Sequence, residues 1–402
     1  MKVLVINSGS SSIKYQLFDM SDKTVLAKGL LEQIGEAESR LTHRSLTRVG
    51  DSVEVTRKQP VTNHQVGFQL IGDVLNQSGA VGDSSELFGI GHRVVHGGEA
   101  FQTPALIDEK VVTAIRALIP LAPLHNPANL AGIEVALKFA PRVPQVAVFD
   151  TAFHQSVPPQ AFRYALPNDL YHDHNVRRYG FHGTSHFYVA KQAAGYLKRA
   201  LASLNLITLH LGNGASVTAI ANGKSVDTSM GMTPLEGLIM GTRSGDIDPA
   251  IIFYLGRQTG LAPDEIESLL NKNSGLKGIC GLNDMRAIAQ SAAEGDASAR
   301  LAIEMYCYRI KKYIGAYHAV LGDVDALVFT GGIGENAANI RLRSCEGLSC
   351  FGIEVDAKRN QLKSKTSGAI QSDRSRVKIL VVPTDEELEI AVQTIAKIRS
   401  LS

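Results

Sequence analysis

Cysteine is scarce in this chain, and the few cysteines are scattered. The four of them, Cys280, Cys307, Cys345 and Cys350, include no Cys-x-x-Cys pair, so the sequence indicates neither a zinc site nor a disulfide framework. A long apolar run is also lacking, since no such run approaches the ~18 residues that a membrane span requires. The N-terminus enters a strand-like segment directly, without the pattern of a signal peptide. We therefore expect a cytoplasmic protein.

An excess of charge of either sign is absent as well. The 41 basic residues against 39 acidic ones give a net charge of +2, which gives no reason to expect a nucleic-acid or membrane partner. A hydrophobic content of 44% and a charged content of 20% are typical of a soluble globular enzyme. The length of 402 residues exceeds the usual size of one core, so we expect two domains.

The most informative stretch runs from residue 3 to residue 19. The β-branched run Val3–Ile6 predicts a buried strand, and the alternation over Ile13–Leu17 predicts a second one. The tip at residues 7–12 contains a glycine, several serines and an asparagine, and Lys14 follows it. Such a tip can offer N–H groups, hydroxyls and an ammonium group to phosphates. A plain serine-rich turn is the alternative.

A second hairpin of the same design lies in the other half of the chain. Residues 206–210 and 215–220 predict its strands, and residues 211–214 form its glycine-rich tip. Two such hairpins predict duplicated domains that face each other across a nucleotide. The order of strands and helices predicts an α/β domain with a mixed sheet in each half, with a boundary near residue 150.

Several further segments bear on the fold. Asn126 is expected to be the N-cap of a helix, with Pro127 in its first turn. A terminal helix near 386–400 is expected to pack on the first domain. Gly223-Lys224-Ser225 resembles the end of a P-loop but lacks the earlier glycine, so it predicts a plain hairpin.

The glycine motif at residues 332–337 follows a predicted strand at 326–330 and imitates a dinucleotide-binding fingerprint. It begins about 70 residues before the C-terminus, which leaves no room for a full dinucleotide domain. A turn that binds phosphate or adenosine is the better interpretation, because the N-terminus of the following helix favours anions.

His92 and His96 suggest a metal site at first sight. The sequence between them predicts a strand, however, and a four-residue offset there spans ~13 Å, too far for one ion. Structural roles are therefore expected for both histidines. Arg93 precedes a double glycine, where a backbone can approach a ligand, and arginine suits a carboxylate or a phosphate. A surface ion pair is the alternative for Arg93.

Two other segments are candidates for chemistry. Asp150 follows a predicted strand at 145–149, the usual position of reactive groups in α/β sheets. Residues 230–246 form a long loop punctuated by glycine that carries Arg243. Loops of this length are usually functional or disordered, and this one is too apolar for disorder.

Taken together, these residues resemble the acetate kinase family, in the superfamily of acetate and sugar kinases, chaperone ATPases and actin. The resemblance covers nearly the whole chain and rests on eight motifs in order, at residues 7–14, 92–98, 123–127, 149–154, 179–186, 210–214, 241–246 and 332–336.

The resemblance implies an α/β fold of two duplicated ribonuclease-H-like (actin-like) domains, with mixed sheets flanked by helices and an active site in the interdomain cleft. The first domain would span 1–150 with the terminal helix at about 386–402, and the nucleotide-binding domain 151–385. It also implies a homodimer and Mg²⁺-dependent transfer between ATP and acetate, with Mn²⁺ as a substitute metal.

The resemblance also assigns roles to individual residues. The implied catalytic residues are Asp150, His182 and Arg243. The implied metal ligands are Asn7 and Glu386. The implied contacts with acetate are Arg93, Val95, Leu124, Phe181 and Pro234, the last four as an apolar pocket for its methyl group. The implied contacts with ATP are Lys14, His210, Leu211, Gly212, Asn213, Gly214, Asp284, Met285, Arg286, Gly332, Ile333, Gly334, Glu335 and Asn336.

This sequence departs from the family pattern at two positions. Asp385 stands where asparagine is usual beside the metal glutamate, which bears on the metal geometry. Met285 stands where phenylalanine is common near adenine, which bears on nucleotide affinity.

Elementary chemistry agrees with these roles. Acetate is an anion at pH 7, with a pKa near ~4, and needs no general base. Two arginines, a histidine, a lysine and Mg²⁺ can neutralise the charge of a phosphoryl group during in-line transfer. Asp150 is then more plausible as an organiser of magnesium, water or arginine, with a proton acceptor as the alternative.

Three other activities stay open at this point. The first is a kinase for propionate or another short-chain fatty acid. The second is an actin- or chaperone-like ATPase switch, for which the arginine pair would lack a purpose. The third is a sugar kinase, which would need a polar pocket in place of Val, Leu, Phe and Pro.

Overall fold

The computed structural model describes residues 1–46, 52–361 and 366–401. These residues form two compact units, and the chain passes from the first to the second and back. Unit 1 comprises residues 1–152 and 385–402, and unit 2 comprises residues 153–384. Among the described residues, no helix combines the length and the apolar character that a membrane span needs.

Unit 1 is built around a mixed sheet with helices on both faces. Its elements are β1 (Lys2–Ser8), β2 (Ile13–Asp19), β3 (Thr24–Glu32), β4 (Ser39–Leu46), β5 (Ser52–Gln59), α1 (His64–Gln77), β6 (Leu87–Val94), β7 (Ala105–Leu106), α2 (Glu109–Ala117), α3 (Asn126–Phe139), β8 (Gln145–Phe149) and α14 (Glu386–Arg399). In the described ranges the strand order is β5-β4-β3-β2-β1-β6-β8-β7.

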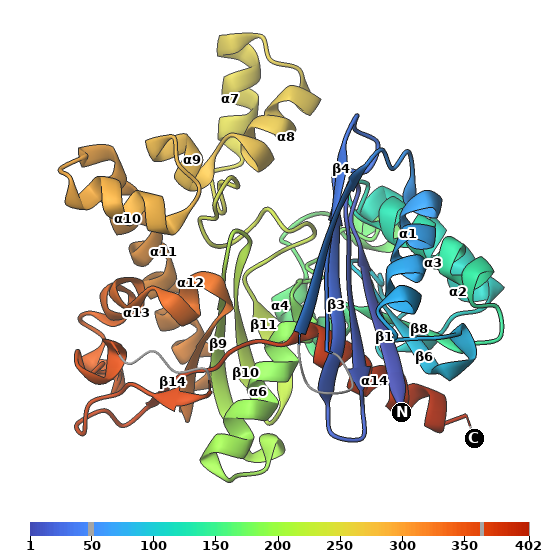
Figure 1. The fold of residues 1–402 in the computed structure, drawn as a ribbon. Coiled ribbons are helices and arrows are strands. Elements are labelled where there is room, and N and C mark those ends of the chain that lie inside the picture. The colour runs from blue at the N-terminus through green and yellow to red at the C-terminus, as the bar shows by residue number, and fades with distance from the viewer. Residues whose placement is uncertain (47–51, 362–365, 402) are drawn as a thin grey trace. The chain divides into compact units, whose positions relative to one another are not determined.

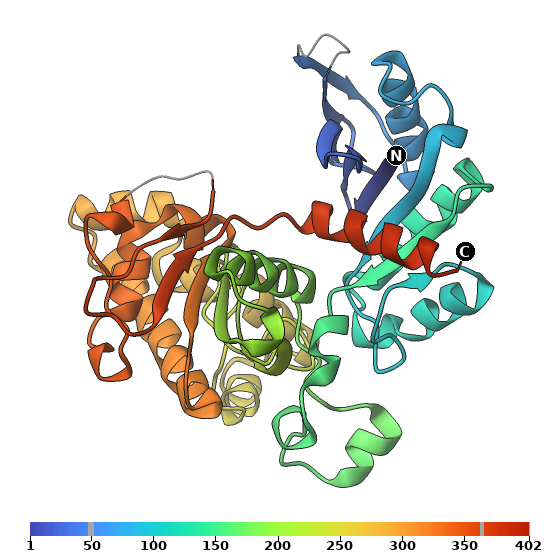
Figure 2. The same ribbon diagram turned by 90° about the horizontal axis from the view of Figure 1, so that it is seen from below.

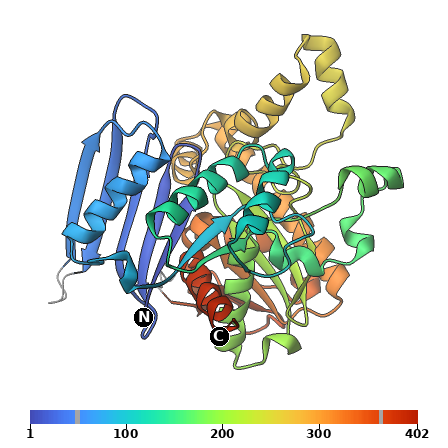
Figure 3. The same ribbon diagram turned by 90° about the vertical axis from the view of Figure 1, so that its right-hand side faces the viewer.

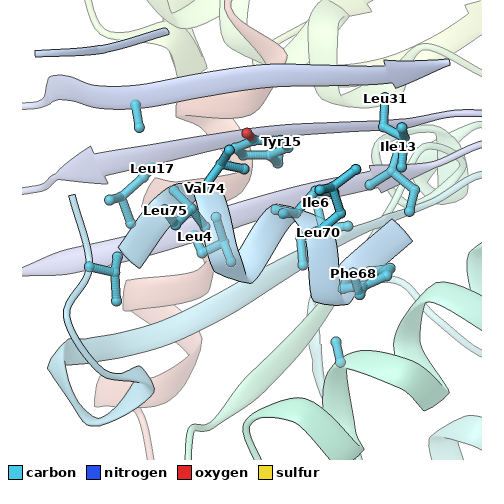
Figure 4. Packing of buried hydrophobic residues seen from close by; sticks show 14 of the residues in the cluster. Leu4, Ile6, Ile13, Tyr15, Leu17, Leu31, Phe68, Leu70, Val74 and Leu75 are labelled. Atoms are coloured by element: carbon cyan, nitrogen blue, oxygen red, sulfur yellow. The ribbon is translucent and has the colours of Figure 1, made fainter. Parts of the chain in front are cut away.

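The alternation of side chains along β1 explains why both faces of this sheet are covered. Leu4 and Ile6 join the cluster that packs against α1 (Figure 4). Val3 and Val5 point to the opposite face and pack against α14. The terminal helix therefore covers the face opposite to α1 and α3, as the views in Figures 2 and 3 show.

Unit 2 has a mixed sheet of its own. Its elements are α4 (Pro159–Phe162), α5 (Asn168–His174), α6 (Gly183–Leu197), β9 (Asn205–Leu211), β10 (Ala215–Ala221), β11 (Lys224–Thr228), α7 (Ala250–Thr259), α8 (Pro263–Lys272), α9 (Gly275–Cys280), α10 (Met285–Ala293), α11 (Ala297–Leu321), β12 (Ala326–Thr330), α12 (Gly331–Asn336), α13 (Ala338–Cys345), β13 (Gly368–Ala369) and β14 (Lys378–Val381). Helix α6 packs on this sheet through Val189, Ala190 and Ala193 (Figure 1).

The two sheets repeat one topology. The order β3-β2-β1-β6-β8-β7 in unit 1 matches β11-β10-β9-β12-β14-β13 in unit 2. In each sheet an antiparallel meander comes first, two parallel strands follow, and a short antiparallel strand ends the row. The predicted α/β fold with duplicated mixed sheets is confirmed, and so are both predicted hairpins.

One local prediction was wrong by a residue. Helix α3 begins at Asn126, so His125 and not Asn126 is its N-cap. The Asn126 side chain instead accepts a hydrogen bond from His96 N and donates one to His96 O, both 3.1 Å long. Because this amide holds the backbone that follows β6, it is not free to cap the helix.

Candidate active site

The polar residues of unit 1 stand where neighbouring strands end. Asn7 lies at the end of β1, Arg93 at the end of β6, and Asp150 directly after β8. These three strands are parallel, so their carboxyl ends meet at one edge of the sheet. Lys14 is the partner of Asn7 across the hairpin. We call Asn7, Lys14, Arg93, Asp150, Glu386 and Glu387 the first group.

Arg93 and Asp150 form a partly buried ion pair in the first group. The Asp150 Oδ2 atom accepts hydrogen bonds from Arg93 Nε at 3.0 Å and from Arg93 Nη2 at 2.6 Å. The Asp150 side chain is only 2% exposed. Such a charge-assisted fork fixes the guanidinium plane. This favours Asp150 as an organiser of Arg93.

Carboxylates outnumber cations in the first group. Glu386 Oε2 lies 3.8 Å from Arg93 Nη2, and Lys14 Nζ binds Glu387 Oε1 at 2.5 Å. Burial raises the pKa of Glu386 to about 7; Arg93 opposes this rise, and Asp150 and Glu387 add to it. Burial alone would lower the pKa of Arg93, but Asp150, Glu386 and Glu387 raise it above its ordinary value. The excess of carboxylates in the first group therefore favours the binding of a cation.

The oxygen donors of the first group fit Mg²⁺. Within the described ranges, no set of three or more His, Cys, Asp or Glu side chains is arranged to hold a metal. Magnesium commonly uses one or two protein oxygens and takes its other ligands from water and phosphate. The Asn7 amide and the Glu386 carboxylate supply that number. Asp385 is engaged elsewhere, because its carboxylate caps α14 by accepting from Leu388 N at 2.9 Å.

The two histidines that flank Arg93 make contacts inside unit 1. His92 Nε2 is hydrogen-bonded to Gln145 Oε1 at 2.8 Å, and burial lowers the pKa of His92 to about 4. His96 Nδ1 accepts a hydrogen bond from Gly98 N at 3.0 Å. Both rings are therefore engaged in the packing behind the first group.

The polar residues of unit 2 gather at the tip of its own hairpin. A methyl group built on Gly214 would lie 3.4 Å from His182 Nε2 and 3.7 Å from Arg243 Nη1. The His182 ring stacks on His210, with ring centroids 4.3 Å apart. We call His182, His210, Asn213, Gly214 and Arg243 the second group.

His182 has an unusual backbone conformation. It is the N-cap of α6 with a φ of 56°, in the left-handed region. That region is uncommon for residues other than glycine, and such residues cluster at functional sites. The left-handed turn starts α6 directly after Phe181 and leaves the His182 ring beside the hairpin tip.

Arg243 is partly buried and has no carboxylate partner among the described residues. Its Nη1 atom donates to Pro234 O at 3.3 Å, and no acidic side chain among the described residues pairs with it. Burial lowers its pKa. A guanidinium in this position can bind an anion without first breaking an ion pair.

The loop that carries Arg243 is held from two sides. Arg178 donates from Nη2 to Glu236 Oε1 at 2.7 Å. Asp246 accepts from Gly237 N at 2.7 Å and from the Tyr313 hydroxyl at 2.8 Å. The predicted functional loop is thus rigidly tied to its own unit, which is what positioning an arginine requires.

Three predicted ATP segments line one cavity of unit 2. Its volume is about 830 Å³, within the range of ligand sites. Its walls include Gly212 and Asn213 from the hairpin tip, Asp284, Met285 and Arg286 around the start of α10, and Gly332, Ile333 and Asn336 from α12. The structure therefore brings three segments that are far apart in the sequence into one pocket.

The N-terminus of α12 is partly engaged by the chain itself. This helix has only six residues, and the Glu335 Oε1 atom accepts from Gly331 N at 3.0 Å and from Thr384 N at 3.2 Å. Gly332 lines the cavity, and the binding of phosphate or adenosine at this turn stays a prediction.

The four residues predicted to enclose the acetate methyl belong to different units. Val95 and Leu124 lie in unit 1, and Phe181 and Pro234 lie in unit 2. Leu124 is 55% exposed, whereas Phe181 is 3% exposed. Their grouping into one pocket stays a prediction.

Comparison with known proteins identifies the family of this chain. The model of the acetokinase family matches residues 2–392. The chain belongs to the acetokinase family. It is 57% identical to the acetate kinase of Syntrophobacter fumaroxidans over 99% of this chain and 97% of the relative. It is also 57% identical to that of Sulfurovum sp. (strain NBC37-1), over the full length of both.

Solved structures of the acetokinase type agree with the fold. The acetate kinase of Porphyromonas gingivalis has a TM-score of 0.93 and 45% identity, with 99% of each chain covered. A propionate kinase from Francisella tularensis has a TM-score of 0.91 and 44% identity, over 98% of this chain and 99% of the other.

Sequence reasoning missed several polar residues around the acetokinase motifs. Glu387 pairs with Lys14, and Ser216 hydrogen-bonds to His182 Nδ1 at 2.9 Å. His186 follows His182 by four residues at the start of α6, and this spacing was a signal that could have been used. Ser216 lies in β10 and gave no local signal.

Proposed function

We propose that this acetokinase family member transfers the terminal phosphoryl group of ATP to acetate, and that it also catalyses the reverse reaction. In the forward direction an acetate oxygen forms a bond to the γ-phosphorus, and the bond from that phosphorus to the β–γ bridging oxygen breaks. The products are acetyl phosphate and ADP. Full-length identity to acetate kinases carries this proposal, and the arrangement of the two groups supports it.

We infer that ATP binds in the 830 Å³ cavity of unit 2. Met285 and the α12 glycines would contact the adenosine, and Asn213, Gly214 and His210 the phosphates. His182 and Arg243 flank Gly214, so they can donate hydrogen bonds to the oxygens of the transferring phosphoryl group.

We infer that the first group receives the acceptor and the metal. Arg93, fixed by Asp150, can bind the acetate carboxylate, while Val95 and Leu124 contact its methyl group. Asn7 and Glu386 would hold Mg²⁺, or Mn²⁺ in its place, and Lys14 would contact a phosphate. When bound, the metal neutralises charge on the phosphate oxygens. The carboxylate excess around Glu386 supports this assignment.

The test is hydroxamate formation from ATP, hydroxylamine and a panel of short carboxylates, with ATP hydrolysis measured in parallel. We expect acetyl hydroxamate to form fastest and ATP hydrolysis without a carboxylate to be negligible. Faster reaction with propionate would favour the activity named for the Francisella tularensis relative. Rapid hydrolysis without any carboxylate would replace the proposal with an ATPase switch.

We further propose that the protein is a homodimer. Helix α7 has no buried residue, and its apolar side chains Ile251, Ile252, Phe253 and Tyr254 are 37–65% exposed. An apolar face of this kind is typical of an interface. Sedimentation equilibrium should give twice the chain mass, and Phe253→Glu should lower it toward the monomer. A wild-type monomer would contradict the proposal.

We also propose a cytoplasmic location, because the reaction consumes and regenerates ATP. Cell fractionation with an antibody against the chain tests this location. Recovery with a membrane or exported fraction would contradict it.

A further inference from the structure

A chain of hydrogen bonds runs from His182 into the interior of unit 2. His182 Nδ1 is bonded to Ser216 Oγ at 2.9 Å, and Ser216 Oγ to His186 Nε2 at 2.8 Å. His186 Nδ1 is bonded in turn to Thr208 Oγ1 at 2.7 Å. We call Thr208, His186 and Ser216 the histidine support. Its three members are fully buried.

The proton positions in this chain follow from the number of hydrogens available. Burial lowers the pKa of His186 well below its ordinary value, so its ring is neutral and carries one N–H. If His182 donated to Ser216, then Ser216 would donate to His186, and His186 would donate to Thr208. The Thr208 hydroxyl proton would then have no acceptor among the described residues. In the opposite direction every proton of the histidine support has an acceptor, because Thr208 donates to His186, His186 to Ser216 and Ser216 to His182.

This outward direction determines what His182 presents to the hairpin tip. Its Nδ1 atom accepts a hydrogen bond from the Ser216 hydroxyl, so its Nε2 atom carries the ring N–H. The Nε2 atom faces the space above Gly214, which Arg243 Nη1 also faces. Two donors from different segments therefore converge there, and each has a fixed orientation.

We propose that Ser216 directly, and Thr208 through His186, act as positioning residues that hold His182 as the Nε2–H tautomer and aim this donor at the transferring phosphoryl group. The role in phosphoryl transfer rests on the proposed function, whereas the tautomer does not. Fixing a tautomer through the second ring nitrogen is a general way to prepare a histidine for its task.

The first test is spectroscopic and needs no substrate. Long-range ¹H–¹⁵N correlation spectra of ¹⁵N-histidine-labelled protein, assigned with a His182→Gln variant, should show Nε2 protonated and Nδ1 unprotonated at His182. In Ser216→Ala the Nδ1 signal should change, because that atom loses its donor. A His182 that carries its proton on Nδ1 in the unmodified protein would overturn the proposal.

The second test is kinetic. Loss of one hydrogen bond of ordinary strength corresponds to roughly a tenfold change, so Ser216→Ala should lower kcat about tenfold, with KM for ATP and acetate nearly unchanged. Thr208→Val keeps the shape and removes the far end of the chain, and should give a smaller decrease in kcat. Ser216→Thr retains a hydroxyl and should recover part of the lost activity.

A matched control exists in the neighbouring strand. Ser225 makes a buried hydrogen bond of the same length, 2.9 Å, to His154 Nδ1. Ser225→Ala should leave kcat and the His182 spectrum unchanged. Equal losses of kcat in Ser225→Ala and Ser216→Ala would show that the histidine support contributes only to packing and would overturn the proposal.

A double variant tests whether Ser216 acts through the His182 ring. Once His182→Ala has removed the supported ring, adding Ser216→Ala should cost no further activity. A further tenfold loss would show that Ser216 acts by another route and would overturn the proposal. If the protein did not phosphorylate acetate at all, the proposed function would fail, while the spectra would still decide the tautomer.

Discussion

Arg93 and Arg243 are the same residue type in opposite settings. Arg93 is bonded to Asp150 through two nitrogens and lies near Glu386. Arg243 lies partly buried beside the carbonyl of Pro234, with no carboxylate partner in the described parts of the chain. The pKa of the first is raised by its carboxylates, and that of the second is lowered by burial. One arginine is already neutralised, and the other is not.

The difference shows how a chain can divide the work of handling two anions. The first group has more carboxylates than cations, a balance that suits a bound metal ion. The second group presents donors without a carboxylate, a balance that suits a bound phosphate. A partly buried, unpaired cation costs free energy, and a bound anion would remove this cost. Arg243 should therefore contribute more to the reaction than any other arginine.

The largest expected effect is that of Arg243→Lys. Lysine keeps the charge but lacks the planar fork, and a comparable arginine in phosphoryl transfer contributes ~10³-fold or more. We expect kcat to fall by roughly this factor, with ATP affinity largely kept. Steady-state kinetics and nucleotide titration measure the two quantities.

Arg116 provides the control for this substitution. It is half exposed and pairs with Glu134 at 2.5 Å on the surface of unit 1, so Arg116→Lys should leave kcat unchanged. A near-normal kcat for Arg243→Lys would remove Arg243 from the transition state and end the contrast with Arg93.

Asp150→Asn is the second prediction and concerns Arg93, the arginine that is paired with a carboxylate. The change keeps the shape but removes the charge that fixes Arg93, so we expect kcat to fall roughly 10²-fold while ATP still binds. Breaking a buried pair also costs about 3–5 kcal/mol of stability, so urea unfolding has to be measured alongside. A loss of ATP binding in a folded variant would make Asp150 a nucleotide residue instead.

The sequence predicted the positions of the site residues better than the contacts that these residues make. Strand ends and hairpins follow from hydrophobic periodicity, so the positions of Arg93, Asp150 and Gly214 at sheet edges could be predicted. The partners of these residues could not, because Glu386 lies nearly 300 positions after Arg93. The capping carboxylate of Glu335 and the bond from Ser216 to His182 also escaped local patterns. The contacts of Glu386 and Ser216 depend on how segments that are far apart in the chain pack together.

Gly214→Ala is the third prediction and tests the open space of the second group. The added methyl group would make ordinary contacts of 3.4 Å with His182 and 3.7 Å with Arg243, so the protein should fold normally. It would occupy the space where the two donors converge, and we expect kcat to fall at least ~10-fold. Gly195 in α6 has open space around its Cα, and Gly195→Ala should leave kcat unchanged. Full activity of Gly214→Ala would place the phosphoryl group elsewhere.

The smallest expected effect is on the choice of substrate, and it tests whether the first group holds the acceptor. Val95 follows β6 directly, and its backbone N–H donates to Asn129 Oδ1 at 3.0 Å. The Asn129 side chain is itself fixed by a 2.7 Å bond from Nδ2 to Ser8 O. The backbone at Val95 is thus held firmly, so the size of its side chain can limit the room beside Arg93.

Discrimination by one methylene group is worth roughly 1–3 kcal/mol. We therefore expect the unmodified protein to use acetate best, propionate less well and butyrate poorly. Val95→Ala should raise kcat/KM for propionate relative to acetate by roughly tenfold, chiefly through KM. The neighbouring Val94 is the control, because it is buried in the core beside Ile133 and Phe149. Val94→Ala should lower stability by about 1–3 kcal/mol and leave the substrate ratio unaltered. If both variants shifted the ratio equally, or neither did, the acceptor would not be bound beside Val95, and Arg93 would need another role.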